Sequence, residues 1–332
     1  MEVTSRPKAT APHERESGAV QAGEIVVVAG LFAFACFEFF RVSGGDDSIA
    51  SRTAAAMLFV LLAGCYLGLS IEPVRRMLRR VTSHGIHRRA AGPAVLLAAI
   101  TLYTVTSGSP VLSQIAPYAL YLFLPLAFLT EKHDSTGSRP IRQLAVAVQL
   151  WLPLTFGLPK LHLGGAYDAT HLVGIVAGLY FFLVLEPLEG LGYTFLLPRR
   201  DWSSAGTALV AFVAVAIPIG LRSGFLAWHP RLNADNLLVS PLHIYLMIAV
   251  PEELLFRGVI QNVCVRWIGS QRGLIVAAIV FGFAHLPDFR YVLLATLAGV
   301  AYGWVFLRTE RITASAVTHA AVDWIWKVAF QR

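Results

Sequence analysis

Long apolar segments alternate with short polar segments along almost the whole chain. Windows of about 17 to 20 apolar residues, the length that crosses a hydrocarbon core of about 30 Å, recur from residue 24 onward. Lipid offers the backbone no hydrogen-bond partners, so such spans are expected to be helices, whereas a barrel would show short alternating segments. The pattern predicts an all-α, polytopic transmembrane helical bundle.

We predict about eleven spans. They cover residues 24–40, 53–71, 90–106, 115–130, 143–157, 172–188, 205–221, 240–266, 272–286, 291–307 and 312–329. Composition agrees with this pattern, because 56% of the 332 residues are hydrophobic and only 14% are charged. The mean hydropathy of +0.63 is far above that of ordinary soluble proteins. The chain is therefore expected to be an integral, multi-pass membrane protein.

The charge pattern predicts how the chain is oriented. Residues 1–23 are polar and mixed in charge, which predicts a disordered cytoplasmic tail. The apolar run that follows is succeeded by Arg41 rather than by a cleavage site, so we expect a retained helix. If the spans alternate across the membrane, most Lys and Arg side chains fall on the same side of it as the N-terminus, above all in the segment 72–89. The positive-inside rule then places the N-terminus in the cytoplasm. The expected location is a bacterial inner membrane, and the net charge of +7 requires no nucleic-acid partner.

The distribution of reactive side chains suggests two parts after the tail. Residues 24–237 hold few ionisable groups in mid-span positions, and we predict N-terminal transmembrane helices that either gate or dock a substrate or form a lipid-facing extension. Residues 238–332 hold a concentrated set and are predicted to be the catalytic core. Cys36, Cys65 and Cys264 have no paired spacing, so they indicate neither a disulfide framework nor a thiolate metal site.

The stretch "VPEELLFRGVI", residues 250–260, places three charges in a strongly apolar region. Charged groups in mid-membrane are costly and usually mark a function or a paired structural site. On a helix, Glu253 and Arg257 are four residues apart and share a face, where they can neutralise each other. Glu252 points about 100° away. The spacing therefore predicts one paired carboxylate and one carboxylate that is free to act as a general base or acid.

Two further segments carry candidate partners for Glu252. In "FGFAH", Phe281 and His285 share a helix face, and in "THAAVDW", His319 and Asp323 do the same. A single histidine in a membrane helix is usually a packed, hydrogen-bonded residue. Two histidines and two carboxylates on three spans, at similar expected depths, favour one functional site near mid-membrane.

In this order, "EELLFR", "FGFAH" and "HAAVD" resemble the motifs EExxxR, FxxxH and HxxxN or HxxxD of the CPBP (CAAX protease/bacteriocin-processing) family of glutamic-type intramembrane proteases. The resemblance covers about residues 238–332. It implies an intramembrane endopeptidase similar to CAAX prenyl protease 2, with Glu253 and Arg257 as a structural pair and Phe281 in support.

The resemblance also implies the roles of the remaining site residues. Glu252 and His285 would activate the attacking water, and His319 with Asp323 would stabilise the tetrahedral oxyanion. Many members carry asparagine where this chain has Asp323, and an ionised aspartate cannot donate a hydrogen bond to an oxyanion. Asp323 would then be protonated, orient His319 or bind a metal.

A metal site stays open from the sequence. Glu252, His285, His319 and Asp323 are a reasonable nitrogen and oxygen ligand set for a divalent metal such as zinc. The chain has no HExxH pattern, however, and although members of the family are often called metalloproteases, we favour a glutamate-driven reaction with no certain cofactor.

The expected partners are the lipid bilayer and a membrane-associated protein or peptide substrate. That substrate could be a prenylated protein, a peptide leader or the C-terminal anchor of an exported protein, and the membrane face to which the site opens is undecided. Two other classes use similar buried charges: a proton-coupled transporter, and a non-catalytic membrane scaffold. His243, together with His162, His171 and His229, is expected in or near solvated loops.

Overall fold

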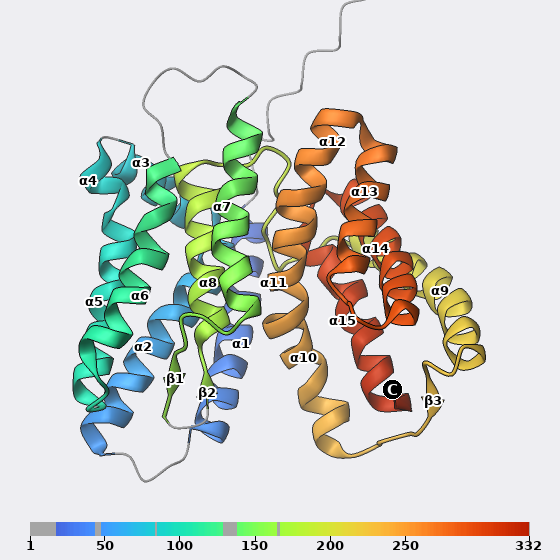
Figure 1. Cartoon of the computed structure of the whole chain (residues 1–332), viewed down its shortest axis with the longest axis horizontal. Coiled ribbons are helices and arrows are strands. Elements are labelled where there is room, and N and C mark those ends of the chain that lie inside the picture. The colour runs from blue at the N-terminus through green and yellow to red at the C-terminus, as the bar shows by residue number, and fades with distance from the viewer. Residues whose placement is uncertain (1–17, 44–47, 84, 129–137, 165–166, 332) are drawn as a thin grey trace, which may run out of the picture.

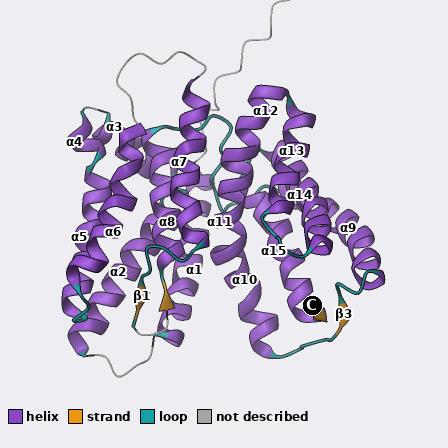
Figure 2. Ribbon diagram, in the orientation of Figure 1, coloured by secondary structure: helices purple, strands orange, loops and turns teal. Residues whose placement is uncertain are grey.

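The computed structural model describes residues 18–43, 48–83, 85–128, 138–164 and 167–331 of the chain. These residues form an all-α bundle, as predicted, with two very short antiparallel strand pairs (Figures 1 and 2). In Figure 1, α1 to α8 lie side by side in one half of the molecule and α9 to α15 in the other.

The N-terminal half contains the following elements. They are α1 (Gly18–Val42), α2 (Ile49–Gly68), α3 (Glu72–Thr82), α4 (Ile86–Arg89), α5 (Ala91–Thr106), α6 (Val111–Phe123), the 3-10 helix η1 (Leu124–Phe128), α7 (Ser138–Thr155), β1 (His162–Leu163), β2 (Tyr167–Asp168), α8 (Thr170–Leu179) and the π-helix η2 (Tyr180–Leu185).

The C-terminal half contains a second set. It comprises α9 (Arg199–Arg222), β3 (Ala227–Trp228), η3 (Asp235–Val239), α10 (Ser240–Ile244), η4 (Tyr245–Ala249), α11 (Val250–Glu253), η5 (Leu254–Gln261), α12 (Asn262–Ile268), α13 (Ser270–Phe283), α14 (Phe289–Thr309), α15 (Ile312–Ala329) and β4 (Phe330–Gln331). Helix α9, N-terminal to the predicted catalytic core, packs on α14 and α15.

All eleven predicted spans overlap helices, but the count of eleven is not confirmed. Within the described part of the chain, six helices are long and apolar enough to cross a membrane. They are Val20–Val42, Ile49–Gly68, Val111–Phe128, Arg199–Arg222, Asp235–Ile268 and Phe289–Thr309. Three shorter apolar helices, at 91–106, 170–185 and 270–283, match other predicted spans. Of the predicted tail, residues 1–17 lie outside the described residues, and α1 begins at Gly18.

The helical stretch Asp235–Ile268 alternates between α-helical and π-helical turns. The segments η3, η4 and η5 are π-helical. Pro241 and Pro251 lie in this stretch, and each lacks the N–H that an α-helical ladder needs. Because a wider turn relieves this mismatch, the helix continues past both prolines and carries the predicted charged motif at Glu252.

Small residues allow α13, α14 and η5 to approach closely. A methyl group added at Gly299 would lie 2.9 Å from the Cα of Ala278 in α13. One added at Gly303 would lie 2.5 Å from the side-chain oxygen of Gln261 in η5. These two glycines therefore allow α14 to pack closely against α13, which carries the second motif, and against η5, which continues from the first motif.

The elements that cap the bundle define two ends. At one end, Arg75 of α3 donates to the carbonyl of Tyr193 at 3.0 Å, and Gly192 forms a parallel bridge with Arg311. We call this end, which also holds α4 and the turn between α12 and α13, the basic end. Residues 223–234 and the end of α15 lie toward the opposite end, and Arg290, just after the turn at 284–288, donates to the carbonyls of Ser223 and Gly224. Figure 1 shows α3, α4 and α12 together at one end and β3 with the chain terminus toward the other.

Candidate active site

The adjacent Glu252 and Glu253, near the middle of the helical stretch Asp235–Ile268, occupy different environments. The Glu253 side chain is 0% exposed and its Oε2 lies 3.1 Å from Nε of Arg257. The Glu252 side chain is 38% exposed and faces a pocket. The i,i+4 spacing therefore leads to the expected ion pair, and the roughly 100° turn between neighbours leaves the other carboxylate accessible.

Glu253 is the centre of a buried polar network. Besides Arg257, it accepts a hydrogen bond of 2.5 Å from Oγ of Ser315 and lies 3.0 Å from Nδ1 of His319. Ser315 and His319 are one turn apart on α15. A single carboxylate thus joins the first motif to the last, and it fixes the orientation of the His319 ring.

Arg257 is held in an aromatic enclosure. Its guanidinium carbon lies 4.7 Å from the ring centre of Phe281 and 5.5 Å from that of Tyr302. None of its side-chain nitrogens has a hydrogen-bond partner among the described residues, and the side chain is fully buried. Its charge is therefore balanced by the ion pair with Glu253 and by the faces of the two rings.

His319 lies between carboxylates. Its Nε2 is 3.5 Å from Oδ2 of Asp323 and 3.8 Å from Oε2 of Glu252, while Nδ1 faces Glu253. Tyr302 stacks on the ring, with centroids 4.6 Å apart and planes inclined by 16°. Both ring nitrogens face oxygens that can only accept when ionised, so both are placed to donate.

His285 lies in the turn that follows α13. Its Nδ1 is 2.7 Å from the carbonyl oxygen of Phe281, and Tyr291 packs against the ring with centroids 4.4 Å apart. A carbonyl can only accept, so Nδ1 carries the proton. In the neutral ring, Nε2 is then unprotonated and can accept a proton.

These groups line one cavity of about 240 Å³. Glu252, His285, His319 and Asp323 all contribute to its wall, together with apolar and aromatic residues from α9, α14 and α15. A second cavity, of about 390 Å³, shares Asp323 with the first and is also lined by Arg231, His243 and Lys327. The four predicted site residues are therefore gathered at one pocket, which continues into a charged one.

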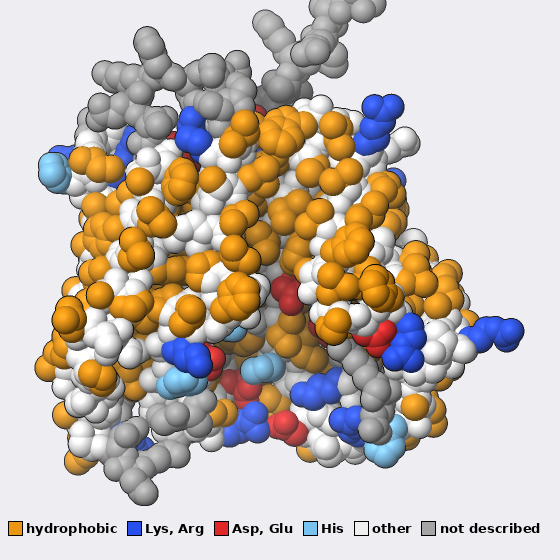
Figure 3. All heavy atoms as spheres, viewed as in Figure 1, with side chains coloured by type: hydrophobic (Ala, Val, Ile, Leu, Met, Phe, Trp, Pro, Cys, Tyr) orange, Lys and Arg blue, Asp and Glu red, His pale blue; other side chains and the backbone are white. Residues whose placement is uncertain are grey.

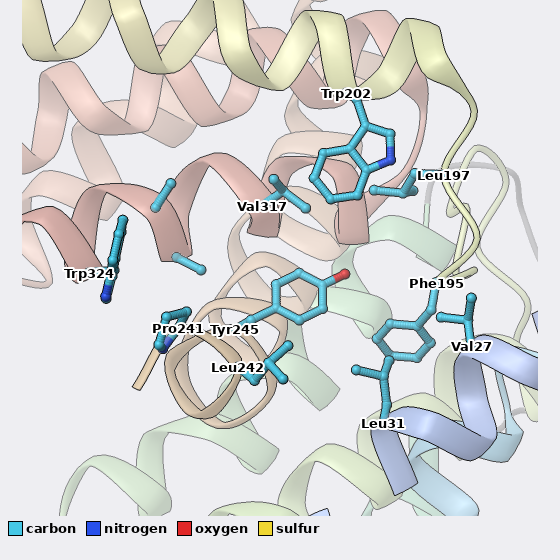
Figure 4. Close-up of a pocket in the computed structure, with 12 residues that line it drawn as sticks. Val27, Leu31, Phe195, Leu197, Trp202, Pro241, Leu242, Tyr245, Val317 and Trp324 are labelled. Atoms are coloured by element: carbon cyan, nitrogen blue, oxygen red, sulfur yellow. The ribbon is translucent and has the colours of Figure 1, made fainter. Parts of the chain in front are cut away.

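An apolar pocket of about 340 Å³ lies on the other face of α15 (Figure 4). Trp324 and Val317 of α15 and Trp202 of α9 surround it, and Tyr245 donates to the carbonyl of Thr313 at 3.3 Å. No aspartate, glutamate, histidine, lysine or arginine is among the residues that line it. It offers no acid or base for catalysis.

The predicted metal-ligand set does not form a metal site. Within the described residues, no group of three or more His, Cys, Asp and Glu side chains is placed to hold an ion. The expectation of a metalloprotease-like site is therefore not supported.

Sequence reasoning missed several contacts around the site. Ser315 and Tyr302 belong to none of the three motifs, although the small polar Ser315 is one turn before His319. The link from Glu253 to His319 was also missed, because helical spacing shows only neighbours on the same helix. His243 was expected in or near a loop, but it lies in α10, where its Nδ1 is 3.0 Å from Glu38 of α1.

The fold and the site together define a membrane protein with a carboxylate and histidine centre inside a helical bundle. Residues 234–325 match the family described as Rce1-like, type II CAAX prenyl endopeptidase Rce1-like. This match confirms the resemblance carried by the three motifs, and at family level it indicates a CAAX protease-type peptidase core. The match spans less than a third of the chain. Searches of curated proteins and of solved structures gave no match.

Proposed function

We propose that this protein is an intramembrane endopeptidase that hydrolyses a peptide bond of a membrane-associated protein or peptide. The observation that carries the proposal is the different placement of the adjacent glutamates. Glu253 is locked in a buried network, whereas Glu252 faces a pocket shared with His285. A structural ion pair alone does not require the second carboxylate, and the family match supports peptide hydrolysis.

Water is the nucleophile in this proposal. Glu252, assisted by Nε2 of His285, accepts a proton from a water molecule while the water oxygen bonds to the peptide carbonyl carbon. The tetrahedral intermediate then collapses, the C–N bond breaks, and the same proton goes to the leaving amine. One water is consumed, and one carboxylic acid and one amine are released. Among the described residues that line this pocket there is no serine, threonine or cysteine, so no acyl-enzyme is invoked.

His319 is placed to stabilise the oxyanion. A donor fixed in advance stabilises developing negative charge without reorganisation at the moment of reaction. Glu253 holds Nδ1 of His319, and Asp323 lies 3.5 Å from Nε2. The 3.5 Å separation from Asp323 is long for a hydrogen bond, so the Nε2–H of His319 is the donor that is left for the oxyanion. Of the three roles considered for Asp323, the protonated form fits this position best, because an ionised carboxylate would compete with the oxyanion for the same proton.

Comparison of membrane-protein termini tests this proposal. Host cells that express the wild type, Glu252→Gln or Glu186→Gln at equal levels are analysed by mass spectrometry. Glu186 is the matched control, because its side chain is 25% exposed and ion-paired with Arg139 away from the pocket. We expect uncleaved termini to accumulate only in Glu252→Gln. Equal termini in all three strains, with rescue of a deletion phenotype by Glu252→Gln, would instead support the scaffold or transporter.

A further inference from the structure

The pocket is closed toward the basic end of the bundle. Between Glu252 and that end lie Arg257, Gln261, Tyr302 and Ser315, each with at most 1% of its surface exposed. Their side chains interlock, since Ser315 also donates to the carbonyl of Tyr302 at 2.8 Å and Gln261 donates to that of Gly303 at 2.9 Å. A polypeptide cannot reach the pocket through this layer without unpacking it.

Toward the opposite end, the helices leave the site open. Helix α13 has 14 residues and so spans only about 21 Å, which is short of the roughly 30 Å hydrocarbon core. Its end, with His285 and the turn at 284–288, therefore lies at membrane depth. Non-helical backbone at that depth is tolerated only where it is buried in protein or lines a water-filled cavity. Asp288 at the end of that turn and Arg290 at the start of α14 form an ion pair and are 38% and 52% exposed, so we expect this charged part of the turn to face water.

Charged side chains continue this water-accessible surface outward. The cavity that shares Asp323 with the catalytic pocket is lined by Arg231, His243 and Lys327. Lys327 donates to Oγ of Ser240 at 2.7 Å, which places it at the start of α10. Figure 3 shows acidic, basic and histidine side chains gathered in a hollow toward one end of the bundle, beneath a largely apolar flank. We name this surface the vestibule: Arg231, His243, Lys327 and the turn 284–288.

The N-terminal half helps to build the vestibule. Glu38 of α1 is buried and lies 3.0 Å from Nδ1 of His243, and Arg41 pairs with Asp235 at 2.8 Å. These contacts fix the end of α1 against the start of the helical stretch Asp235–Ile268. The N-terminal helices are therefore attached at the side of the molecule where the pocket opens.

From these features we infer that substrates enter through the vestibule from the extracytoplasmic side, so that the scissile bond belongs to an exported or membrane-inserted polypeptide. Arginines crowd the basic end, where α3 and α4 carry Arg75, Arg76, Arg79, Arg80, Arg88 and Arg89. By the positive-inside rule this end faces the cytoplasm, and the vestibule faces away from it. The substrate class rests on the proposed peptidase function, whereas the side of access does not.

Cysteine labelling tests the side of access. Cys36, Cys65 and Cys264 are replaced by alanine, and single cysteines are introduced as Arg231→Cys in the vestibule and Arg76→Cys in α3. Bacterial spheroplasts that express each full-length variant are treated with a membrane-impermeant maleimide. We expect labelling of Arg231→Cys in intact spheroplasts, and of Arg76→Cys only after membrane disruption.

Any of three results would overturn the inference. These are labelling of Arg76→Cys but not Arg231→Cys in intact spheroplasts, labelling of both variants in intact spheroplasts, and no labelling of Arg231→Cys even after membrane disruption. Arg290→Cys, at the start of α14, replaces Arg231→Cys if that variant does not accumulate. The termini that depend on Glu252 test the substrate class separately. If they lie in cytoplasmic segments, the access inference is wrong and the peptidase stands. If labelling is as expected but no terminus depends on Glu252, access stands and the peptidase, with its substrate class, is wrong.

Discussion

Glu253→Gln and Glu252→Gln should separate stability from activity at neighbouring positions. Each change keeps the side-chain shape and removes one negative charge. At position 253, the charge lies within 3.1 Å of Arg257 and 3.0 Å of His319, and all three side chains are at most 4% exposed. Loss of one partner leaves a buried charge without compensation, which costs about 3 to 5 kcal/mol.

At position 252 the same change should cost much less. The Glu252 side chain is 38% exposed, and its nearest cationic partner, Nε2 of His319, is 3.8 Å away. A pair of this kind contributes about 0 to 1 kcal/mol. We therefore expect Glu252→Gln to keep the unfolding free energy within about 1 kcal/mol of the wild type while losing peptidase activity.

The assay is reversible unfolding of the purified full-length protein in mixed micelles, titrated with a denaturing detergent and followed by circular dichroism. Glu253→Gln combined with Arg257→Met provides a control, because removal of both partners of a buried ion pair is far less costly than removal of one. The double variant should recover part of the loss. Equal destabilisation by Glu252→Gln and Glu253→Gln would refute the assignment of one structural and one accessible carboxylate.

Three further outcomes follow from the structure. Gly299→Ala should destabilise the protein by about 1 to 3 kcal/mol in the same titration, because the new methyl would press on the backbone at Ala278. The control Gly206→Ala should be neutral or stabilising, because nothing lies within 4 Å of the added methyl. The double variant Arg231→Gln, Lys327→Gln should lower kcat/KM for an acidic substrate about tenfold at low salt, because the two positive charges steer such a substrate toward the pocket. The difference from the wild type should shrink as salt is added, and kcat/KM for a neutral substrate should not change. Because the candidate ligands are not grouped for a metal, exhaustive chelation should leave the cleavage rate unchanged, and loss of activity restored by zinc would contradict the metal-free reaction.

The sequence alone predicted the features that depend on a single helix. Apolar windows predicted the helices, because lipid leaves the backbone no alternative. Spacing of four residues predicted that Glu253 and Arg257 would pair and that Glu252 would point elsewhere. These are properties of a single helix and require no knowledge of its neighbours.

Contacts between helices were less accessible to sequence reasoning. The pairing of Glu253 with His319 and Ser315, and the stacking of Tyr302 on His319, depend on how η5, α14 and α15 cross. Span length was also misleading, because α13 is shorter than a full crossing and the water-facing turn beyond it could not be recognised from hydropathy. The direction in which the pocket opens follows from that turn and from the buried layer behind Glu252.

The central claim is that Glu252 and His285 act on one water molecule, and a double-mutant cycle tests it most directly. Cleavage rates are measured on purified full-length protein, with a substrate peptide taken from a terminus that depends on Glu252. The wild type is compared with Glu252→Gln, His285→Asn and the double variant. Groups that act as a unit are strongly non-additive, so the account predicts that the double variant is about as slow as the slower single variant. Multiplicative losses, or a Glu252→Gln protein that cleaves at the wild-type rate, would contradict it.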